Sequence, residues 1–376
     1  MPSRVRDDRS EPGLEASAPE ALEELIRQAE SAGASDIHLQ MDGKTARVAF
    51  RLDGVMTPAG GELPEGLAER VFGRIKFLAR LKTYQESLPQ DGRIEKGDVA
   101  AHSDIRVATY PTVTGEKIVL RLFAASGVMT LAELGFPEAA RLALEGLLRQ
   151  TSGLLLLTGP SGSGKTTTIY ACLRHLADLG GRHVITVEDP AEQIIAGVMQ
   201  TEVNAALGLD YAKATRHLMR QDPQVIVIGE IRDEETADIA VRAAFTGHLV
   251  ISTLHAGSCR GVFERLFVMC EDRYAAVAAV EMVINERLLR TLCPECKGEG
   301  CEACLRTGYR GRMPLVEWVR ADDAMRARLR GRIAGNPQGD ASCVTPAVPL
   351  AEAAKKLIEQ GVTDDAEYLR VFGGRT

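Results

Sequence analysis

The spacing of apolar residues divides the chain into a small first module and a larger second one. Residues 19–33 carry apolar positions at helical spacing and end on a glycine, which predicts an amphipathic helix. A second helix is expected over residues 69–82. Three segments alternate apolar and polar residues and therefore predict strands, at 47–54, 104–111 and 116–123. Together these elements predict a small α+β domain over residues 19–123.

The second module is marked by continuous apolar runs that each end at polar residues. The runs lie at 154–157, 183–187, 225–228 and 248–253. Uninterrupted apolar runs of this length are typical of parallel strands buried on both faces by helices. We therefore predict an α/β domain over residues 137–376, whose last part forms two short helices. Residues 124–136 are expected to be a linker, and residues 1–18 a disordered lead-in.

Composition and charge restrict the classes of protein that fit. A chain of 376 residues with 45% hydrophobic residues is large enough for two to three domains with real cores. The net charge of −7 argues against a surface built mainly to hold nucleic acid, so no nucleic-acid partner is expected. The sequence shows neither an apolar stretch long enough to cross a bilayer nor a signal-peptide core. We therefore expect a cytoplasmic protein that reaches a membrane only through a partner.

A glycine-rich loop follows the first buried run. Gly159, Gly164, Lys165 and Thr166 fill the pattern G-x-x-x-x-G-K-[ST]. Glycines let consecutive backbone N–H groups converge on a phosphate, the lysine supplies the opposite charge, and the threonine hydroxyl is suited to Mg²⁺. The loop therefore predicts binding of ATP with Mg²⁺. The expected nucleotide contacts are Gly159, Pro160, Ser161, Gly162, Ser163, Gly164, Lys165, Thr166 and Thr167.

Polar residues at the ends of the other three runs are candidates for catalysis. Glu188 follows the second run and can orient or deprotonate the water that attacks the γ-phosphate, or it simply starts a turn into Pro190. Glu230 follows the third run in the manner of a Walker B acid, acting on Mg²⁺, on the attacking water or on both. His255 lies near the end of the fourth run, where a histidine can donate a hydrogen bond to the γ-phosphate.

Four of the eight cysteines form two C-x-x-C pairs in a short segment. They are Cys293, Cys296, Cys301 and Cys304. Two such pairs predict a structural zinc site, because four thiolates complete a tetrahedron and leave no open catalytic position. The four-residue spacer is shorter than in common zinc ribbons, so reduced cysteines in a surface loop remain the alternative.

Two arginines of the first module are candidates for completing the ATP site. Arg93 and Arg106 lie beside predicted turn or strand positions, from which a guanidinium can reach a phosphate held by another domain. The alternative for each is an ordinary solvated or salt-bridged arginine.

These motifs resemble the ATPases of type II secretion and type IV pilus assembly over residues 19–376. GPSGSGKTTT is similar to that family's Walker A motif, VEDPAE to its Asp box, VIVIGEIRDEETA to its Walker B motif and TGHLVISTLH to its His box. The segments LPQDGR and DIRVATYPTVTGE resemble its small first domain. The C-x-x-C pairs followed by TGYRGR are similar to the assembly and secretion branch rather than to pilus retraction motors.

The resemblance implies a PAS-like domain joined to a RecA-like P-loop domain, a homo-hexamer, and Arg93 and Arg106 as the arginines that complete the ATP site. It also implies an inner-membrane platform protein as the partner. Glu286 stands where the family tends to carry glutamine, Ala49 where it tends to carry arginine, and Gln224 where it tends to carry aspartate. We expect the chain to lack the large N-terminal extension by which many members dock onto a membrane partner.

The sequence therefore favours an ATPase motor for pilus assembly or type II secretion, and leaves open which of the two. One rival is a RecA-like nucleic-acid translocase, which the single tryptophan and the acidic balance disfavour. Another is a nucleotide-gated adaptor with little turnover, which the retained Lys165, Glu188 and Glu230 disfavour.

Overall fold

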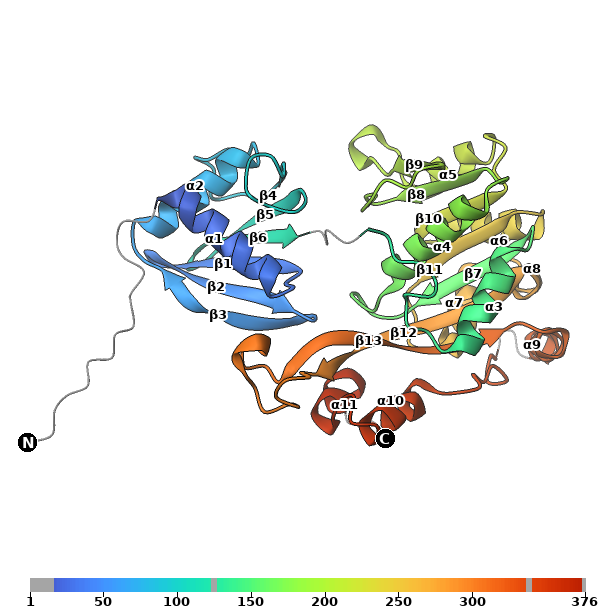
Figure 1. The fold of residues 1–376 in the computed structure, drawn as a ribbon. Coiled ribbons are helices and arrows are strands. Elements are labelled where there is room, and N and C mark those ends of the chain that lie inside the picture. The colour runs from blue at the N-terminus through green and yellow to red at the C-terminus, as the bar shows by residue number, and fades with distance from the viewer. Residues whose placement is uncertain (1–16, 123–126, 336–339, 374–376) are drawn as a thin grey trace, which may run out of the picture. The chain divides into compact units, whose positions relative to one another are not determined.

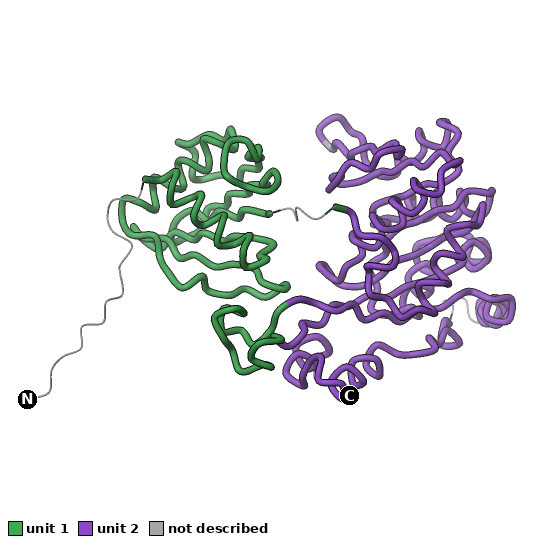
Figure 2. Tube along the Cα trace, in the orientation of Figure 1, with its two compact units in different colours: residues 1–127, 293–310 green, residues 128–292, 311–376 purple. Residues whose placement is uncertain are grey.

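The computed structural model describes residues 17–122, 127–335 and 340–373. Of the expected lead-in, residues 1–16 lie outside the described residues, as do residues 124–126 of the expected linker. The chain divides into two compact units, 1–127 with 293–310 and 128–292 with 311–376 (Figure 2). The cysteine-bearing segment thus groups with the first unit, whereas the sequence analysis placed it in the second domain.

The first unit is an antiparallel sheet with two helices. Its helices are α1 (Ala18–Ser31) and α2 (Leu67–Leu78), and its strands are β1 (Asp36–Asp42), β2 (Thr45–Leu52), β3 (Val55–Leu63), β4 (Gln90–Ile94), β5 (Ile105–Thr112) and β6 (Gly115–Leu122). The strand order is β3-β2-β1-β6-β5-β4 (Figure 1). Ser17 and Glu20 form a capping box that starts α1. The apolar sides of both helices, including Ile26 and Ile75, join the buried core of the sheet.

The sequence predicted three strands here, and the described residues form six. Strands β1, β3 and β4 were missed. β1 lies between β2 and β6 inside the sheet, whereas β3 and β4 lie at its two edges and are rich in glycine, proline or charged residues, which suit an edge but weaken the alternation signal. The unit is α+β as predicted, and its likeness to a PAS domain stays a prediction.

The second unit contains a mainly parallel sheet with helices on both faces (Figure 1). The strand order is β13-β12-β7-β11-β10-β8-β9. The strands are β7 (Gly153–Thr158), β8 (Val184–Glu188), β9 (Val198–Glu202), β10 (Val225–Ile231), β11 (Leu249–Leu254), β12 (Val280–Leu292) and β13 (Tyr309–Arg320). Strands β7 to β12 pair in parallel, so the carboxyl ends of β7, β8, β10 and β11 meet at one edge.

Alternate strand residues point into two separate cores. Leu155 and Leu157 of β7 pack with α3 (Glu138–Leu148) and α4 (Lys165–Leu179) on one face. Leu154 and Leu156 belong to the core on the other face. The helices of that face are α5 (Tyr211–Leu218), α6 (Glu234–Phe245), α7 (Cys259–Met269), α8 (Arg273–Ala279) and α9 (Asp323–Gly335). Burial on both faces explains the uninterrupted apolar runs of the sequence.

Two further segments differ in detail from the prediction. Strands β9, β12 and β13 were not predicted. In β12 the polar residues Asn285 and Glu286 interrupt the apolar pattern although both are buried. Leu131 and Leu134 of the expected linker are buried in the core of the second unit, so this stretch is packed. The two predicted C-terminal helices are present as α10 (Leu350–Glu359) and α11 (Asp365–Phe372).

Candidate active site

The glycine-rich loop connects β7 to α4 and has the backbone of a phosphate-binding loop. Gly159 has φ +141°, and a Cβ there would lie 2.5 Å from the carbonyl oxygen of Glu286. Gly164 has φ +110° and directly precedes α4, whose first residue is Lys165. Any larger residue at these two positions is strained or clashes, so the sequence pattern has a steric cause. The exposed Thr166 lies in the first turn of α4, as expected for a ligand of Mg²⁺.

Lys165 folds back onto its own loop in this structure. Its Nζ donates to the carbonyl oxygens of Gly159 at 2.9 Å and Pro160 at 2.8 Å. Burial lowers the pKa of Lys165, and the negative charges of Glu286 and Glu230 partly oppose this effect. An ammonium group held by two carbonyl oxygens is pre-positioned beside the loop and can exchange them for phosphate oxygens.

The structure brings the predicted strand-end residues together with the loop in one pocket. The pocket is lined by Ser161, Gly162, Lys165, Thr166, Glu188, Glu230 and His255, and also by Tyr170, Asp189, Tyr211 and Arg232. All of these belong to the second unit. The ends of β7 and β11 are tied by Thr158, whose hydroxyl donates to the carbonyl oxygen of Ala256 and accepts from its N–H, both at 2.9 Å. This pair fixes the backbone next to His255.

Glu230 is held by two cationic or protonatable groups. Its Oε1 lies 2.8 Å from Nε2 of His255, and its Oε2 accepts from Nε of Arg232 at 2.8 Å. Arg232 also stacks over the ring of Tyr211, 5.6 Å from the ring centre. The side chain of Glu230 is 18% exposed, so it remains accessible from the pocket. The nearby Asp233 has a different task, since it caps α6 by accepting the N–H of Thr236.

Glu188 is buried and surrounded by neutral donors. Its Oε1 accepts from Thr186 Oγ1 at 2.5 Å and from Gln200 Nε2 at 2.9 Å, and its Oε2 accepts from the hydroxyl of Tyr170. The carboxylate therefore does more than start a turn, because strands β8 and β9 and helix α4 all converge on it. The two strand-end glutamates thus have different surroundings, with a guanidinium and an imidazole at Glu230 and hydroxyl and amide partners at Glu188.

A third glutamate lies behind the phosphate loop, on β12. Glu286 is 1% exposed, and its Oε1 has no hydrogen-bond partner among the described residues. Its Oε2 lies 3.0 Å from the position that a Cβ on Gly164 would take. Burial raises the pKa of Glu286 to about 8, although a hydrogen bond with Thr168 and the charge of Lys165 act in the opposite direction.

Arg93 and Arg106 lie in the first unit, directly opposite each other on the neighbouring strands β4 and β5. Arg93 forms an ion pair with Asp104, which agrees with the salt-bridged alternative for the state described here.

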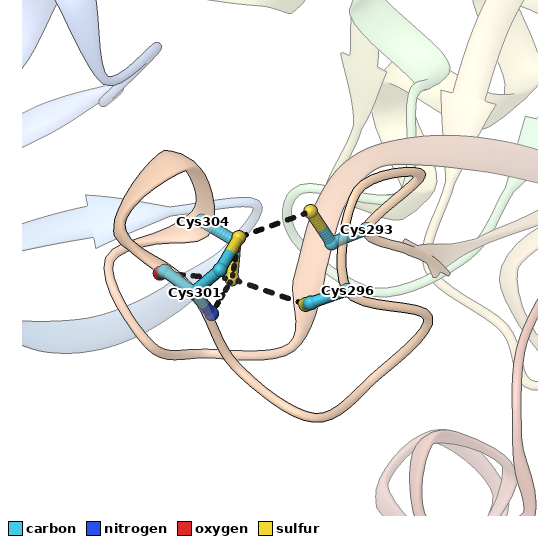
Figure 3. A group of neighbouring side chains, drawn as sticks. All are labelled: Cys293, Cys296, Cys301 and Cys304. Atoms are coloured by element: carbon cyan, nitrogen blue, oxygen red, sulfur yellow. Dashed lines mark hydrogen bonds between the residues drawn. The ribbon is translucent and has the colours of Figure 1, made fainter.

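The four cysteines of residues 293–304 form one cluster (Figure 3). Three pairs of sulfur atoms, Cys293 with Cys301, Cys296 with Cys304 and Cys301 with Cys304, are each 3.8 Å apart. A tetrahedron with Zn–S bonds of about 2.3 Å has sulfur atoms about 3.8 Å apart, so the cluster fits zinc. Backbone N–H groups of Gly300, Cys301 and Gly308 point at the sulfur atoms of Cys296 and Cys304, at 3.2 to 3.3 Å.

Comparison with known proteins agrees with this geometry. A family model described as "Type II/IV secretion system protein" matches residues 14–370. The chain belongs to the type II/IV secretion system protein family. The type II secretion system protein E of Pseudomonas aeruginosa is 39% identical to it, over 93% of this chain and 74% of the relative. The type IV pilus assembly ATPase TfpB of Acinetobacter baylyi is 36% identical, over 92% of this chain and 64% of TfpB.

Solved structures show the same fold. The Legionella pneumophila ATPase DotB matches with a TM-score of 0.73 at 21% identity, covering 97% of this chain and 98% of DotB. The pilus retraction motor PilT with bound ADP matches with a TM-score of 0.64 at 24% identity, covering 93% of this chain and 96% of PilT. The predicted family and the α/β fold with a RecA-like ATPase domain are thereby confirmed. In the described ranges of this family member, no helix is long and apolar enough to cross a membrane.

Sequence analysis missed several residues of the site in this secretion-family chain. Tyr170 and Gln200 contact Glu188 but belong to no motif, and Arg232, which contacts Glu230, lies within VIVIGEIRDEETA without having been marked as a partner. Glu286 was noted only as a departure from the family pattern. A buried glutamate inside an apolar strand was the available signal, since such residues are rare without a partner.

Proposed function

We propose that the chain is a hexameric ATPase motor that couples ATP hydrolysis to type IV pilus assembly or type II secretion. It would work in the cytoplasm, at the inner membrane, through a platform protein of the secretion or pilus machinery. The observation that carries the proposal is the single pocket at the strand ends, where Lys165 and the glycine-rich loop meet two carboxylates, Glu188 and Glu230. Membership of the secretion family supports the motor role, and the acidic net charge of −7 speaks against a nucleic-acid track.

In this proposal each group of the pocket has a separate task. The loop N–H groups, the N-terminus of α4 and Lys165 bind the phosphates, and Thr166 holds Mg²⁺, which neutralises charge on the phosphate oxygens. Glu188 takes a proton from the attacking water. Glu230 orients that water or the water shell of the metal. His255 lies 2.8 Å from Glu230 and donates toward the γ-phosphate once that phosphate is present.

The test separates binding from turnover. Lys165→Ala removes the charge that neutralises phosphate in the ground state, so ATP binding should be lost. Glu230→Gln keeps the shape of the pocket and removes a group needed for the reaction, so ATP should bind nearly as in the wild type while hydrolysis stops. Calorimetric binding and phosphate release are measured on both variants. An equal loss of binding in both would contradict this division of roles. A wild-type protein that binds ATP without turnover would favour the nucleotide-gated adaptor.

The proposal also assigns Arg93 and Arg106 to the ATP site. A cation opposite Lys165 is needed for the charge that shifts in the transition state, and this pair of the first unit supplies it when the unit closes on the site, within one chain or across a ring interface. Closure and release would then be the working stroke. Arg93→Ala or Arg106→Ala should lower turnover about 10³-fold with modest loss of ATP affinity. Full activity in both variants, or in a dilute monomer, would refute this coupling.

For the tetracysteine segment we propose one structural zinc per chain. The fit of the sulfur spacing to a ZnS₄ tetrahedron supports it. Elemental analysis of protein purified without chelator should give one zinc per chain. Absence of metal in that preparation would contradict the zinc site and would support the alternative, four reduced cysteines in a surface loop.

A further inference from the structure

Tyr170 connects the phosphate loop to Glu188 and is assigned no role by any motif. It lies on α4, the helix that begins with Lys165, and it is 6% exposed. Its phenolic oxygen contacts Glu188 Oε2 and the backbone N–H groups of Glu192 and Gln193, the latter two at 2.8 Å and 3.3 Å. One oxygen atom thus joins the helix of the phosphate loop, the strand-end acid and the loop that follows it.

The neighbours of the hydroxyl fix the direction of its proton. A tyrosine hydroxyl has one proton to donate and two lone pairs to accept with. The N–H groups of Glu192 and Gln193 can only donate, so they occupy the lone pairs. The proton must therefore point to Glu188. Burial and the contact with Glu188 raise the pKa of Tyr170, so the phenol keeps this proton throughout the neutral range.

The same counting leaves Glu188 with one open acceptor position among the described residues. A carboxylate has about four positions, and Oε1 accepts from both Thr186 and Gln200. Oε2 accepts from Tyr170 and keeps one lone pair. Gln200 is itself held, since it accepts from Ile195 N–H at 2.7 Å and donates to Gln193 O at 2.9 Å. The carboxylate therefore cannot rotate without breaking several hydrogen bonds.

We propose that Tyr170 is a positioning residue for ATP hydrolysis, which aims the remaining lone pair of Glu188 Oε2 at the attacking water. This inference rests on the proposed function, because it takes Glu188 as the group that receives the water proton. Tyr170 lies on the helix whose N-terminus binds the phosphates. Movement of that helix on binding ATP is therefore transmitted directly to the acid, and the loop at residues 192–193 follows because it is bonded to the same oxygen.

The variant Tyr170→Phe tests this role because it keeps the ring and removes only the hydroxyl. Glu188 then loses the bond that holds Oε2, and turnover should fall about 10-fold to 100-fold while the Kd for ATP changes less than about threefold. The matched control is Tyr368→Phe, a buried tyrosine of α11 that packs on Phe372 and does not line the pocket. Its turnover should equal that of the wild type. Thermal unfolding of both variants checks that the fold is kept.

A double variant separates positioning from a merely structural role. If Tyr170 acts through Glu188, Tyr170→Phe should add no further loss of turnover to Glu188→Gln. If the losses multiply, or if Tyr170→Phe alone retains turnover within twofold of an active wild type, the assignment is wrong while the ATPase proposal stands. A wild-type chain without ATPase activity at any protein concentration would instead refute the ATPase proposal itself, and this inference with it.

Discussion

On the pocket side of the phosphate loop, Glu188 and Glu230 each accept hydrogen bonds from several donors, whereas behind the loop Glu286 has an oxygen without a partner among the described residues. Glu188 and Glu230 lie at or near the ends of β8 and β10, and Glu286 lies within β12, directly after Asn285, which pairs with the last residue of β7 in the same sheet. Burial at Glu286 favours the neutral form and raises its pKa to about 8.

This difference shows that position at the sheet edge does not by itself give a carboxylate a chemical role. A charged acid in the pocket can hold metal-bound water or receive a proton. A charged acid behind the loop would weaken the positive potential that binds phosphate, since it faces Lys165 from the other side. We infer that neutral Glu286 acts only through its packing behind the loop. Its ionisation should lower both the stability of the fold and the affinity of the loop for phosphate. The following predictions test the contrast, from the largest expected effect to the smallest.

The strongest test is Glu188→Gln on the pocket side. The amide keeps the size of the carboxylate but cannot take a proton from water, so turnover should fall about 10³-fold, as in Glu230→Gln. Steady-state ATPase assays measure it, with Glu138→Gln on the exposed face of α3 as the control. Hydrolysis at the wild-type rate would make Glu188 a structural group, and the contrast with Glu286 would then rest on Glu230 alone.

The next test is the pH dependence of stability in Glu286→Gln. Below pH 4.5, Glu286 is protonated in both the folded and the unfolded chain, so the variant and the wild type should be equally stable. As pH rises from 4.5 to about 8, the unfolded glutamate ionises while the folded one stays protonated, and the wild type loses stability relative to glutamine. The variant should be more stable by about 3 kcal/mol at pH 7.

Urea unfolding of both proteins between pH 5 and pH 9 measures this difference. A stability gap that stays constant over the whole range would mean that Glu286 does not titrate as burial predicts. A wild type that is more stable than the variant at pH 8 would mean that a partner holds the charged form.

A smaller effect is expected on ATP affinity. Above about pH 8 the wild-type Glu286 ionises behind the loop, and its charge repels the bound phosphates. The Kd for ATP should therefore rise up to about tenfold between pH 7 and pH 9 in the wild type, and stay flat in Glu286→Gln. The groups that act on Glu286 are Lys165 and Thr168 of α4, and the charge of Glu286 in turn raises the pKa of Cys172 on the same helix. If the Kd for ATP depends on pH in the same way in both proteins, ionisation of Glu286 does not affect phosphate binding, and the proposed difference from the pocket glutamates is wrong.

The smallest effect on the nucleotide is expected from the cysteine cluster, none of whose four residues lines the pocket. Cys296→Ser removes one of four sulfur ligands, so zinc content and thermal stability should fall. The Kd for ATP should change less than about twofold, because residues 293–310 contribute nothing to the pocket. A large loss of ATP affinity with full zinc content would contradict this separation.

The four strands of the second unit that carry the site, β7, β8, β10 and β11, could be predicted because their signals are local. A buried parallel strand shows as an apolar run, and the loop from Gly159 to Thr166 shows as a fixed spacing, whatever the rest of the chain does. The acids at the ends of β8 and β10 followed from the same runs, and the structure brings both into the pocket. The edge strands β3 and β4 were not predicted, because one side of an edge strand faces solvent and its residues do not alternate clearly between apolar and polar.

The partners of the site residues could not be predicted because they depend on tertiary packing. Tyr170 and Glu188 come into contact only when α4 packs on β8, and their spacing along the chain does not predict this contact. Glu286 and Gly164 meet only because β12 pairs with β7, and β12 itself was not predicted. A motif thus predicts which side chains take part in the chemistry. The tertiary packing determines which atoms hold these side chains in place and whether they are charged.

The central place of β7 has a consequence for synthesis of the chain. Leu154 of β7 lies opposite Val250 of β11 on one side and Val280 of β12 on the other. The ribosome makes the chain from its N-terminus, so the strand that carries the phosphate loop is complete long before either neighbour exists. Pairings between such distant segments also form slowly, because a long loop must be closed first. The nascent chain therefore carries this apolar strand without its two neighbours from the synthesis of Thr158 until β11 and β12 are complete, at Leu254 and Leu292.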